Sequence, residues 1–421
     1  MTINDTGDGA LLGMLPGGLS KGALRGIVVL DITRVVAGPF CSMLLADLGA
    51  TVIKIENPKD PDYARDFPPK LEADSGEEFS AFFAQFNRNK FGLTIDLSTE
   101  DGKSLLKRLV RRADVLVENF RPGTMDKLGV GFEVLRAENP RLVYTAISGY
   151  GQTGPYRRRP AYDNSAQATG GLWSINGFPD RPPARVGTII GDLSATLYAV
   201  IGTLAALREA EKTGRGQLVD VSQQDSVLSL TENAVVSYTV DGKVPGPLGN
   251  EHPFVKPYEL YPCKDGFVFF GGYTDKFWRL SCHLFGEPEL ADDPEIDTMA
   301  KRFVPEVYER RIRPLLHTWF EDKTKSELEE IVGDAVPLSA IKDIGEVVED
   351  PQIAVRDMVV DVEYPEFGEL RMFGSPIKLG DTPAQPRGLA PKVGEHAGPV
   401  LRALADLDER QIAELREKGV I

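Results

Sequence analysis

Residues 27–55 alternate between strand-like and helical patterns. Residues 27–30 form a short apolar run of the kind found in buried strands, and residues 51–55 favour a second strand. Between them, residues 40–48 have the spacing of a helix, which Gly49 would end. Two strands joined by a helix lie parallel in one sheet. The pattern therefore predicts a βαβ unit of Rossmann type, with ligand sites at the carboxyl ends of the strands.

The same alternation continues along most of the chain and predicts an α/β fold with a parallel sheet. A further helix is expected at residues 99–112. The first strand-to-helix loop, residues 31–39, lacks the G-x-G-x-x-G phosphate fingerprint, which disfavours a nicotinamide dinucleotide site. The further strands are expected at residues 93–95, 115–117, 142–147 and 218–221, and another helix at residues 224–236.

The character of the chain changes after residue 257. A segment dense in Gly and Pro precedes two short strands, at 259–261 and 267–270, and then helices that contain aromatic residues. We therefore expect a Rossmann-like large domain with a parallel sheet and a smaller α+β domain. The expected parts are a mobile tail (1–23), the first part of the large domain (24–240), a linker or lid (241–257), the small domain (258–345), and a return linker with the C-terminal part of the large domain (346–421).

A long helical pattern begins beside Gly191 and Asp192. Residues 186–190 read as the end of a buried strand or as extended chain that feeds the helix. Asp192 is thereby placed at a helix N-terminus, where the unpaired amides and the helix dipole favour a carboxylate. Its small neighbours leave room for a ligand, and a plain helix N-cap is the alternative. The apolar residues that the spacing places on one face are Leu197, Val200, Ile201, Leu204 and Leu207.

Composition narrows the classes of function. The 421 residues carry a formal net charge of -15, which argues against a nucleic-acid or anionic-membrane binder. The longest apolar runs fall short of a membrane span. Three cysteines without paired spacing indicate a reducing, cytoplasmic compartment. The four histidines lie far apart in the sequence, so we expect no metal site.

Several segments occur in a fixed order along the chain: LRGIVVLDITRVVAGPFCSMLLADLGATVIKIENP, FNRNKFGLTIDLSTEDGKSLLKRLVRRADVLVENFRPGTMDKLG, SGYGQTGPYRRRPAYDNSAQATGGL, GTIIGDLSATLYAVIGTLAAL, TGRGQLVDVS and GEHAGPVL. Together they resemble the successive motifs of the class III CoA-transferase family, which includes formyl-CoA transferase and carnitine CoA-transferase. The resemblance implies two chains interlocked as rings, each with a Rossmann-like large domain built from both chain ends.

The resemblance also implies the site. In the family, the aspartate of a Gly-Asp motif before a long helix is the nucleophile, and it corresponds to Asp192, next to Gly191. Tyr162 and Asp163 correspond to a tyrosine and an acidic residue beside the nucleophile. Val36 stands where formyl-CoA transferase has glutamine, and Lys127 where it has arginine. The residues that match CoA-contacting positions are Val35, Val36, Ala37, Ile95, Asp96, Leu97, Ser98, Asn119, Phe120, Thr124 and Lys127.

The implied reaction moves CoA from an acyl-CoA thioester to a carboxylic acid through an aspartyl anhydride and an aspartyl-CoA thioester. CoA and acyl-CoA are then substrates, and no cofactor is permanently bound. Residues 245–249 would serve as a lid or as a plain linker. A dicarboxylate acceptor and a succinyl-CoA donor are expected, because cations could hold a second carboxylate. These cations are Arg157, Arg158, Arg159, Arg185, His252 and Lys256, although an arginine run is also typical of a solvated surface.

Other functions stay open. An acyl-CoA racemase or isomerase of the same superfamily would carry histidine at the position of Tyr162, and tyrosine is a poor base at neutral pH. Asn119 and Phe120 would also suit a turn and a core position, and Asp163 a helix cap. The chain could also be one subunit of a heteromeric transferase rather than half of a homodimer.

Overall fold

The computed structural model describes residues 22–386 and 388–421. The expected tail (1–23) lies outside these residues except for its last two positions. The chain divides into two compact units. The first comprises the described residues up to Leu172 with Val186–Val235 and Gln352–Ile421, and the second comprises Trp173–Arg185 and Val236–Pro351. Residues 173–185, which the sequence analysis assigns to the large domain, thus group with the second unit.

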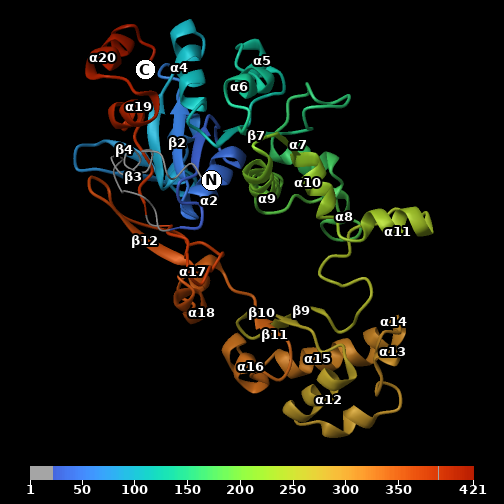
Figure 1. Cartoon of the computed structure of the whole chain (residues 1–421). Helices are drawn as coiled ribbons and strands as arrows, with labels where there is room; N and C mark the ends of the chain where they lie inside the picture. Colours follow the sequence, from blue (N-terminus) through green and yellow to red (C-terminus); the bar gives the residue numbers. More distant parts are fainter. Residues whose placement is uncertain (1–21, 387) are drawn as a thin grey trace. The chain divides into compact units, whose positions relative to one another are not determined.

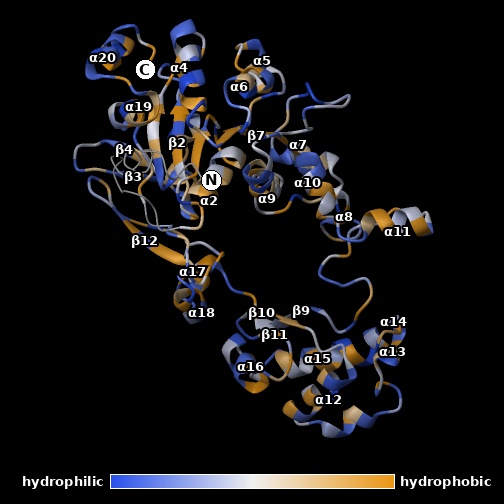
Figure 2. Ribbon diagram, viewed as in Figure 1, coloured by the Kyte–Doolittle hydropathy of each residue, from blue (hydrophilic) through white to orange (hydrophobic). Residues whose placement is uncertain are grey.

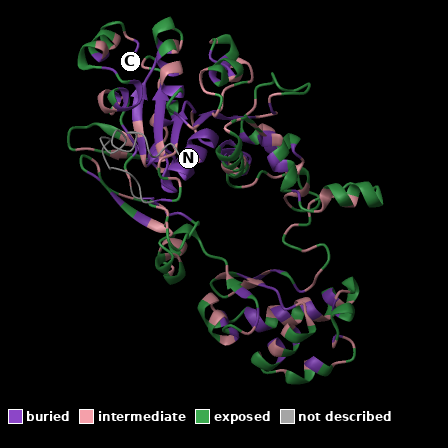
Figure 3. Ribbon diagram, in the orientation of Figure 1, coloured by how far each residue is buried: buried purple, intermediate pink, exposed green. Residues whose placement is uncertain are grey.

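A wholly parallel six-stranded sheet forms the centre of the first unit, as the sequence predicts (Figure 1). Its spatial order is β5-β2-β1-β6-β7-β8, and each neighbouring pair is parallel. Its strands are mostly apolar and buried, because helices cover both faces (Figures 2 and 3). The strands are β1 (Val28–Asp31), β2 (Thr51–Glu56), β5 (Lys90–Thr94), β6 (Val115–Glu118), β7 (Val143–Ser148) and β8 (Leu218–Ser222).

The strand order reverses between β1 and β6. From β1 the chain adds β2 and β5 on one side, and then returns to place β6 on the other side of β1. The loops that follow β1 and β6 therefore leave the sheet in opposite directions. Such a switch point opens a crevice at the carboxyl edge of a parallel sheet, and this crevice is where ligands bind in such folds.

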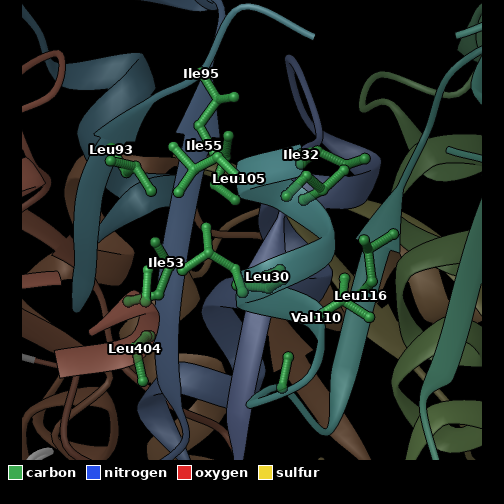
Figure 4. Close-up of a cluster of buried hydrophobic side chains, with 14 of the residues drawn as sticks. Leu30, Ile32, Ile53, Ile55, Leu93, Ile95, Leu105, Val110, Leu116 and Leu404 are labelled. Carbon is green, nitrogen blue, oxygen red and sulfur yellow. The ribbon is translucent and has the colours of Figure 1, made fainter. Parts of the chain in front are cut away.

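One face of the sheet is covered by helices from both ends of the chain. Leu30 and Ile53 pack there with Leu105 of α4 (Glu100–Val110) and Leu404 of α19 (Ala397–Ala405) (Figure 4). Thr99 caps α4 by accepting the N–H of Gly102. The remaining helices that contribute to this core are α5 (Thr124–Lys127), α6 (Phe132–Glu138) and α20 (Glu409–Glu417).

The opposite face is covered by α2 (Ala37–Asp47) and α9 (Ile190–Thr213), which also contact each other. Small residues allow α9 to approach β7 closely, and the hydroxyls of Thr203 and Thr145 hydrogen-bond at 2.7 Å. Leu197 and Ile201, which the sequence places on the apolar face, are 53% and 61% exposed. Val200 and Leu207 of the predicted face are buried, and the other buried residues of the helix are Gly191, Ser194, Ala195, Thr196, Ala199, Thr203, Ala206 and Ala210.

By length and composition α9 could cross a membrane. Half of its most apolar 18-residue window is nevertheless buried inside the chain, as in the core helix of a globular domain. The helix ends at Gly214, whose φ of 71° is the left-handed conformation that glycine adopts readily.

Two sequence predictions around α9 need correction. Of the two alternatives for residues 186–190, the buried strand is wrong, because residues 186–189 form no strand and are exposed or half-buried chain that leads into α9. The helix expected at 224–236 is two helices, α10 (Gln223–Ser229) and α11 (Ala234–Asp241). Glu232, in the connection, has a φ of 54°, which an α-helix does not tolerate.

Two β-hairpins complete the first unit and share a core that includes Phe83 and Tyr364. They are β3 (Lys70–Glu72) with β4 (Glu78–Ser80), and β12 (Val359–Tyr364) with β13 (Gly368–Phe373). The remaining helices are η2 (Tyr63–Asp66), α3 (Ala81–Asn87), α7 (Asp163–Thr169) and α18 (Pro351–Val355), while α8 (Leu172–Ile175) passes from the first unit into the second.

The second unit has its own antiparallel sheet, ordered β11-β10-β9, and an aromatic core. Phe285 stacks on Trp319 with ring centroids 4.8 Å apart. The strands are β9 (Glu259–Cys263), β10 (Gly266–Phe270) and β11 (Leu338–Ala340). The helices are α12 (Asp275–Leu284), η3 (Pro288–Asp292), α13 (Met299–Arg302), α14 (Pro305–Val307), η4 (Tyr308–Ile312), α15 (Arg313–Phe320), α16 (Lys325–Val332) and α17 (Ile344–Val348).

Candidate active site

Asp192 lies in the first turn of α9, two residues after the helix begins at Ile190. The N-cap position is Ile189, and no side chain caps the helix there. The N-cap interpretation of Asp192 is therefore wrong. Its carboxylate does not cap the helix, and it lies at the positive end of a 24-residue helix.

Asp163 secures the start of α9 from a neighbouring helix. It is the first residue of α7, and its Oδ1 accepts the N–H of Gly191 at 2.7 Å and that of Asp192 at 3.4 Å. Its Oδ2 accepts Nε2 of Gln167 at 2.7 Å. Asp163 is 6% exposed. The structure thus brings the predicted pair of acids together and gives Asp163 a capping function on another helix.

Gln223 is a site residue that the sequence analysis missed. Its Nε2 donates a hydrogen bond to Oδ1 of Asp192, although 31 residues separate the two. Gln223 is buried and begins α10, directly after β8. The available signal was topological, because a polar residue that follows a parallel strand faces the edge where ligands bind.

The surroundings of Asp192 disfavour its ionised form. Burial raises the pKa of Asp192 to about 7, and the negative charge of Asp163 adds to the rise. A carboxyl group with this pKa is ionised in a large fraction of molecules at neutral pH. It then carries a poorly solvated charge, which suits a nucleophile.

Tyr162 precedes Asp163 and is 73% exposed. Tyr63 of η2 lies within electrostatic range of both Tyr162 and Asp192, and its pKa is raised by burial and by their charges. The guanidinium of Arg34 lies 5.8 Å from the centre of the Tyr63 ring. Tyr63 therefore connects the surroundings of Asp192 with the loop that follows β1.

That loop contains two of the predicted CoA-contacting residues, Val35 and Val36, and a third, Ala37, begins α2 directly after it. Val35 has a φ of 70°, which is unusual for a β-branched residue, and its N–H donates to the carboxylate of Asp62 at 3.1 Å. The carbonyl of Ala37 accepts the hydroxyl of Thr196 at 2.7 Å. The loop is thereby hydrogen-bonded to α9 one turn beyond Asp192.

Asn119 links the two loops at the switch point. Its Oδ1 accepts the N–H of Arg34 at 2.9 Å, and its Nδ2 donates to the Arg34 carbonyl at 2.8 Å. Two opposed hydrogen bonds fix the loop after β6 against the loop after β1. Asn119 therefore acts as a turn residue, and the same two hydrogen bonds hold the loop that contains the predicted CoA-contacting residues.

A cavity of about 210 Å³ lies at the carboxyl ends of β1, β2 and β5. Four of the predicted CoA-contacting residues line it, namely Ile95, Leu97, Ser98 and Phe120. Among its other lining residues are Arg34, Asp60 and Leu128. The apolar residues of the lining suit a flat heterocycle, whereas the guanidinium of Arg34 is paired with Asp60 at 2.9 Å.

The other predicted CoA contacts have different positions. Hydrogen bonds from Lys59 and Ser98 lower the pKa of Asp96 to about 2. Thr124 and Lys127 begin and end α5, which leads into Leu128, but neither lines the cavity. Lys127 is exposed and available to an anion at the surface.

Buried ion pairs stabilise this edge of the sheet. Lys54 is fully buried, and its Nζ donates to the Thr33 carbonyl at 2.6 Å and to Asp62 at 3.1 Å. Asp62 in turn holds the N–H of Val35. Lys90 forms a second buried ion pair with Asp31 at 2.8 Å, and its pKa is lowered to about 8 by burial.

A larger cavity of about 690 Å³ lies at the amino edge of the sheet, among residues such as Thr51, Phe91 and His396. None of the predicted site residues lines it. The smaller cavity remains the candidate binding site, because it adjoins the switch point.

The cations proposed to hold a second carboxylate have other partners or lie in solvent. Lys256 pairs with Glu251 at 2.9 Å, within the second unit. Arg157, Arg158 and Arg159 are exposed, and the Arg159 guanidinium stacks 3.7 Å from the centre of the Tyr156 ring. In the described part of the chain, no group of three or more His, Cys, Asp or Glu residues could hold a metal ion.

Comparisons with known proteins identify the family of the chain. The model of CoA-transferase family III matches residues 24–397. A succinyl-CoA:mesaconate CoA-transferase of Haloarcula hispanica is 38% identical and covers 90% of this chain and 96% of its own length. A succinate–glutarate CoA-transferase of Agrobacterium fabrum is 37% identical, with 92% and 97% covered.

Solved structures agree as well. The crystal structure of a CaiB/BaiF family protein from Brucella suis superposes with a TM-score of 0.80 at 34% identity, covering 91% of this chain and 99% of its own. The parallel sheet, the order of the motifs and these matches lead to one conclusion. The chain belongs to CoA-transferase family III and is a CoA-transferase.

Proposed function

We propose that the chain transfers CoA from a dicarboxylic acyl-CoA, such as succinyl-CoA, to a dicarboxylic acid, with Asp192 as the nucleophile. The observation that carries this proposal is the setting of Asp192, in the first turn of α9 between the carboxylate of Asp163 and the amide of Gln223. A partly desolvated carboxylate with a pKa of about 7 is a stronger nucleophile than one in water.

The reaction would proceed in covalent steps. One carboxylate oxygen of Asp192 attacks the thioester carbonyl, the C–S bond breaks, and CoA leaves as thiolate. The thiolate then attacks Cγ of the mixed anhydride, which releases the first acid as carboxylate and leaves an aspartyl-CoA thioester. An acceptor carboxylate repeats the sequence in reverse, so no net proton or electron is exchanged.

The dicarboxylate preference is supported by the names of the similar proteins. Mesaconate, glutarate and succinate are all dicarboxylates, and the enzymes named for them are 37–38% identical to this chain over nearly its whole length. Acceptor rates with succinate and glutarate, compared with butyrate and valerate of matching chain length, test this part. Faster transfer to the monocarboxylates would contradict it.

We also propose that two chains interlock as a homodimer. Exposed apolar side chains on two helices support the presence of a partner surface, for example Leu197 and Ile201 of α9 and Val236 and Val240 of α11. Light scattering of the purified chain should give twice the monomer mass of 46.1 kDa. A stable monomer, or a requirement for a second gene product, would contradict the homodimer.

The nucleophile is tested by mass. The intact chain is incubated with candidate acyl-CoAs, and the products are trapped with hydroxylamine and mapped. A covalent change at Asp192 that disappears in Asp192→Ala supports the proposal. Turnover by Asp192→Ala, or an adduct at another residue, would contradict it. Exchange of the α-proton of the acyl group without an acceptor would point to a racemase instead.

A further inference from the structure

The hydrogen-bond donors around Asp192 are unequally distributed. The first-turn N–H groups of Gly191 and Asp192 both point to Asp163, at 2.7 and 3.4 Å. They are therefore engaged with a different carboxylate. The side-chain amide of Gln223 donates instead to Oδ1 of Asp192 itself.

Gln223 is also held firmly in place. It is 7% exposed, and its backbone is fixed by the junction of β8 and α10. Ser222 caps α10 by accepting the N–H of Asp225 at 3.2 Å. A donor that is anchored in this way needs no rearrangement when charge develops on its acceptor.

We infer that Gln223 is a catalytic residue, whose Nε2–H stabilises the oxyanion that forms on Oδ1 of Asp192 when Cγ is attacked. This inference rests on the proposed function of Asp192 as the nucleophile. It assigns the attack on the thioester to Oδ2, because Oδ1 is occupied by the amide.

The electron balance shows which steps Gln223 serves. In the mixed anhydride, Oδ2 carries the acyl group and Oδ1 is the aspartyl carbonyl oxygen. Sulfur of the CoA thiolate bonds to Cγ, and the carbonyl electron pair moves to Oδ1. When that pair returns, the Cγ–Oδ2 bond breaks and the acid leaves as carboxylate, without gain or loss of a proton. The acceptor carboxylate that later attacks the aspartyl-CoA thioester forms the same oxyanion.

The first step differs. When Asp192 attacks the acyl-CoA thioester, the negative charge develops on the oxygen of the acyl group and not on Oδ1. Loss of the Gln223 amide should therefore leave formation of the anhydride faster than its conversion to the aspartyl-CoA thioester. This ordering distinguishes an oxyanion donor from a residue that merely orients the nucleophile, since poor orientation would slow the first step as well.

The test compares Gln223→Leu with Gln224→Leu in the full-length chain. Gln224 is the next residue of α10, and its Nε2 donates to the Thr169 carbonyl at 3.1 Å. With the acyl-CoA that wild type turns over fastest, Gln223→Leu should lower kcat roughly 10²- to 10³-fold, with KM within about threefold. Gln224→Leu should match wild type. In single turnovers, intact mass should show the acyl adduct of Gln223→Leu accumulating, where wild type accumulates the CoA adduct.

Each outcome is informative. Wild-type kcat and a wild-type ratio of acyl to CoA adduct in Gln223→Leu would overturn the inference and leave the nucleophile intact. Equal slowing of both steps would also overturn it, in favour of an orienting role. If wild type forms no adduct at Asp192, the proposed function fails and the inference fails with it. If Gln223→Leu does not fold, Gln223→Asn keeps the amide one methylene short and should show a smaller shift toward the acyl adduct.

Discussion

The carboxylate of Asp163 accepts the backbone N–H of Gly191 at 2.7 Å, so the first residue of α7 fixes the first turn of α9. The N-cap of α9 is Ile189, which has no side-chain oxygen to do this. As a consequence, a second acid lies beside Asp192 and raises its pKa further, beyond the larger effect of burial. The residue that fixes the position of the proposed nucleophile thus also contributes to its raised pKa.

The pH dependence of activity should follow Asp192. Because burial and Asp163 raise its pKa to about 7, and the nucleophile must be ionised, kcat/KM should rise about tenfold per pH unit below about pH 7 and level off above it. Asp163→Asn removes the neighbouring charge and should shift this limb to lower pH. Asp225→Asn, an exposed acid in the first turn of α10, is the control. Limbs that coincide in wild type and Asp163→Asn would contradict the coupling.

Stability should change in the opposite sense. A carboxyl group whose pKa is higher in the folded state than in the unfolded state binds more protons when the protein is folded. Stability therefore falls as the pH rises from 3.8, the pKa in the unfolded state, to about 7, the pKa in the folded state. Asp192→Asn removes this cost and should raise the free energy of unfolding at pH 8 by on the order of 1–3 kcal/mol. Denaturant unfolding at pH 8 and pH 4 measures it. A difference as large at pH 4 would show that ionisation is not the cause.

The structure leaves no space for a side chain at Gly191. A Cβ at this position would lie 2.9 Å from Oδ1 and 3.2 Å from the carbonyl oxygen of Asp163, so Gly191→Ala must displace the residue that caps α9. We expect kcat/KM to fall about tenfold, which corresponds to about 1.4 kcal/mol. Gly187→Ala is the matched control, since its Cβ meets nothing within 4 Å. Steady-state kinetics of both variants test this prediction, and equal kcat/KM values would contradict the steric argument.

Asn119 should control affinity for CoA. Asn119→Ala removes both hydrogen bonds to the Arg34 backbone, so the loop after β1 loosens and KM for acyl-CoA should rise about tenfold. The control is Asn139→Ala, which removes three hydrogen bonds away from this loop, to the carbonyls of Val110 and Ala113 and from the N–H of Arg141. Both variants should lose about 1–2 kcal/mol of stability. A tenfold rise of KM in both would mean that general loosening is responsible.

The fold was largely predictable because it depends on local patterns. The strands at 27–30, 51–55 and 115–117 were located to within one residue, since apolar runs bounded by turns identify buried parallel strands. The helix pattern around α9 predicted its existence and the burial of Val200 and Leu207, but it also placed Leu197 and Ile201 on the buried face. Leu197 and Ile201 follow the helical period but are exposed, and most of the residues that α9 buries are small.

The candidate site was also predicted only in part. Asp192, Asp163 and a set of CoA-contacting residues were named through motifs that lie along the sequence. The structure places Asp163 beside Gly191 and four residues of the CoA set around one cavity, whose other lining residues were not named. Gln223 was missed because its partner is 31 residues away, and no local pattern relates a strand's end to a helix's first turn.

The sequence by itself determined the alternation of strands and helices, the parallel sheet and the family of the chain, because each depends on residue order. Only the tertiary structure decided which donors face which acid. The backbone N–H of Gly191 donates to Asp163, and the side-chain amide of Gln223 donates to Asp192, because β8 ends at the same sheet edge at which α9 begins its first turn. Hydrogen-bond partners depend on distances of a few ångströms across the fold, and sequence spacing does not encode them.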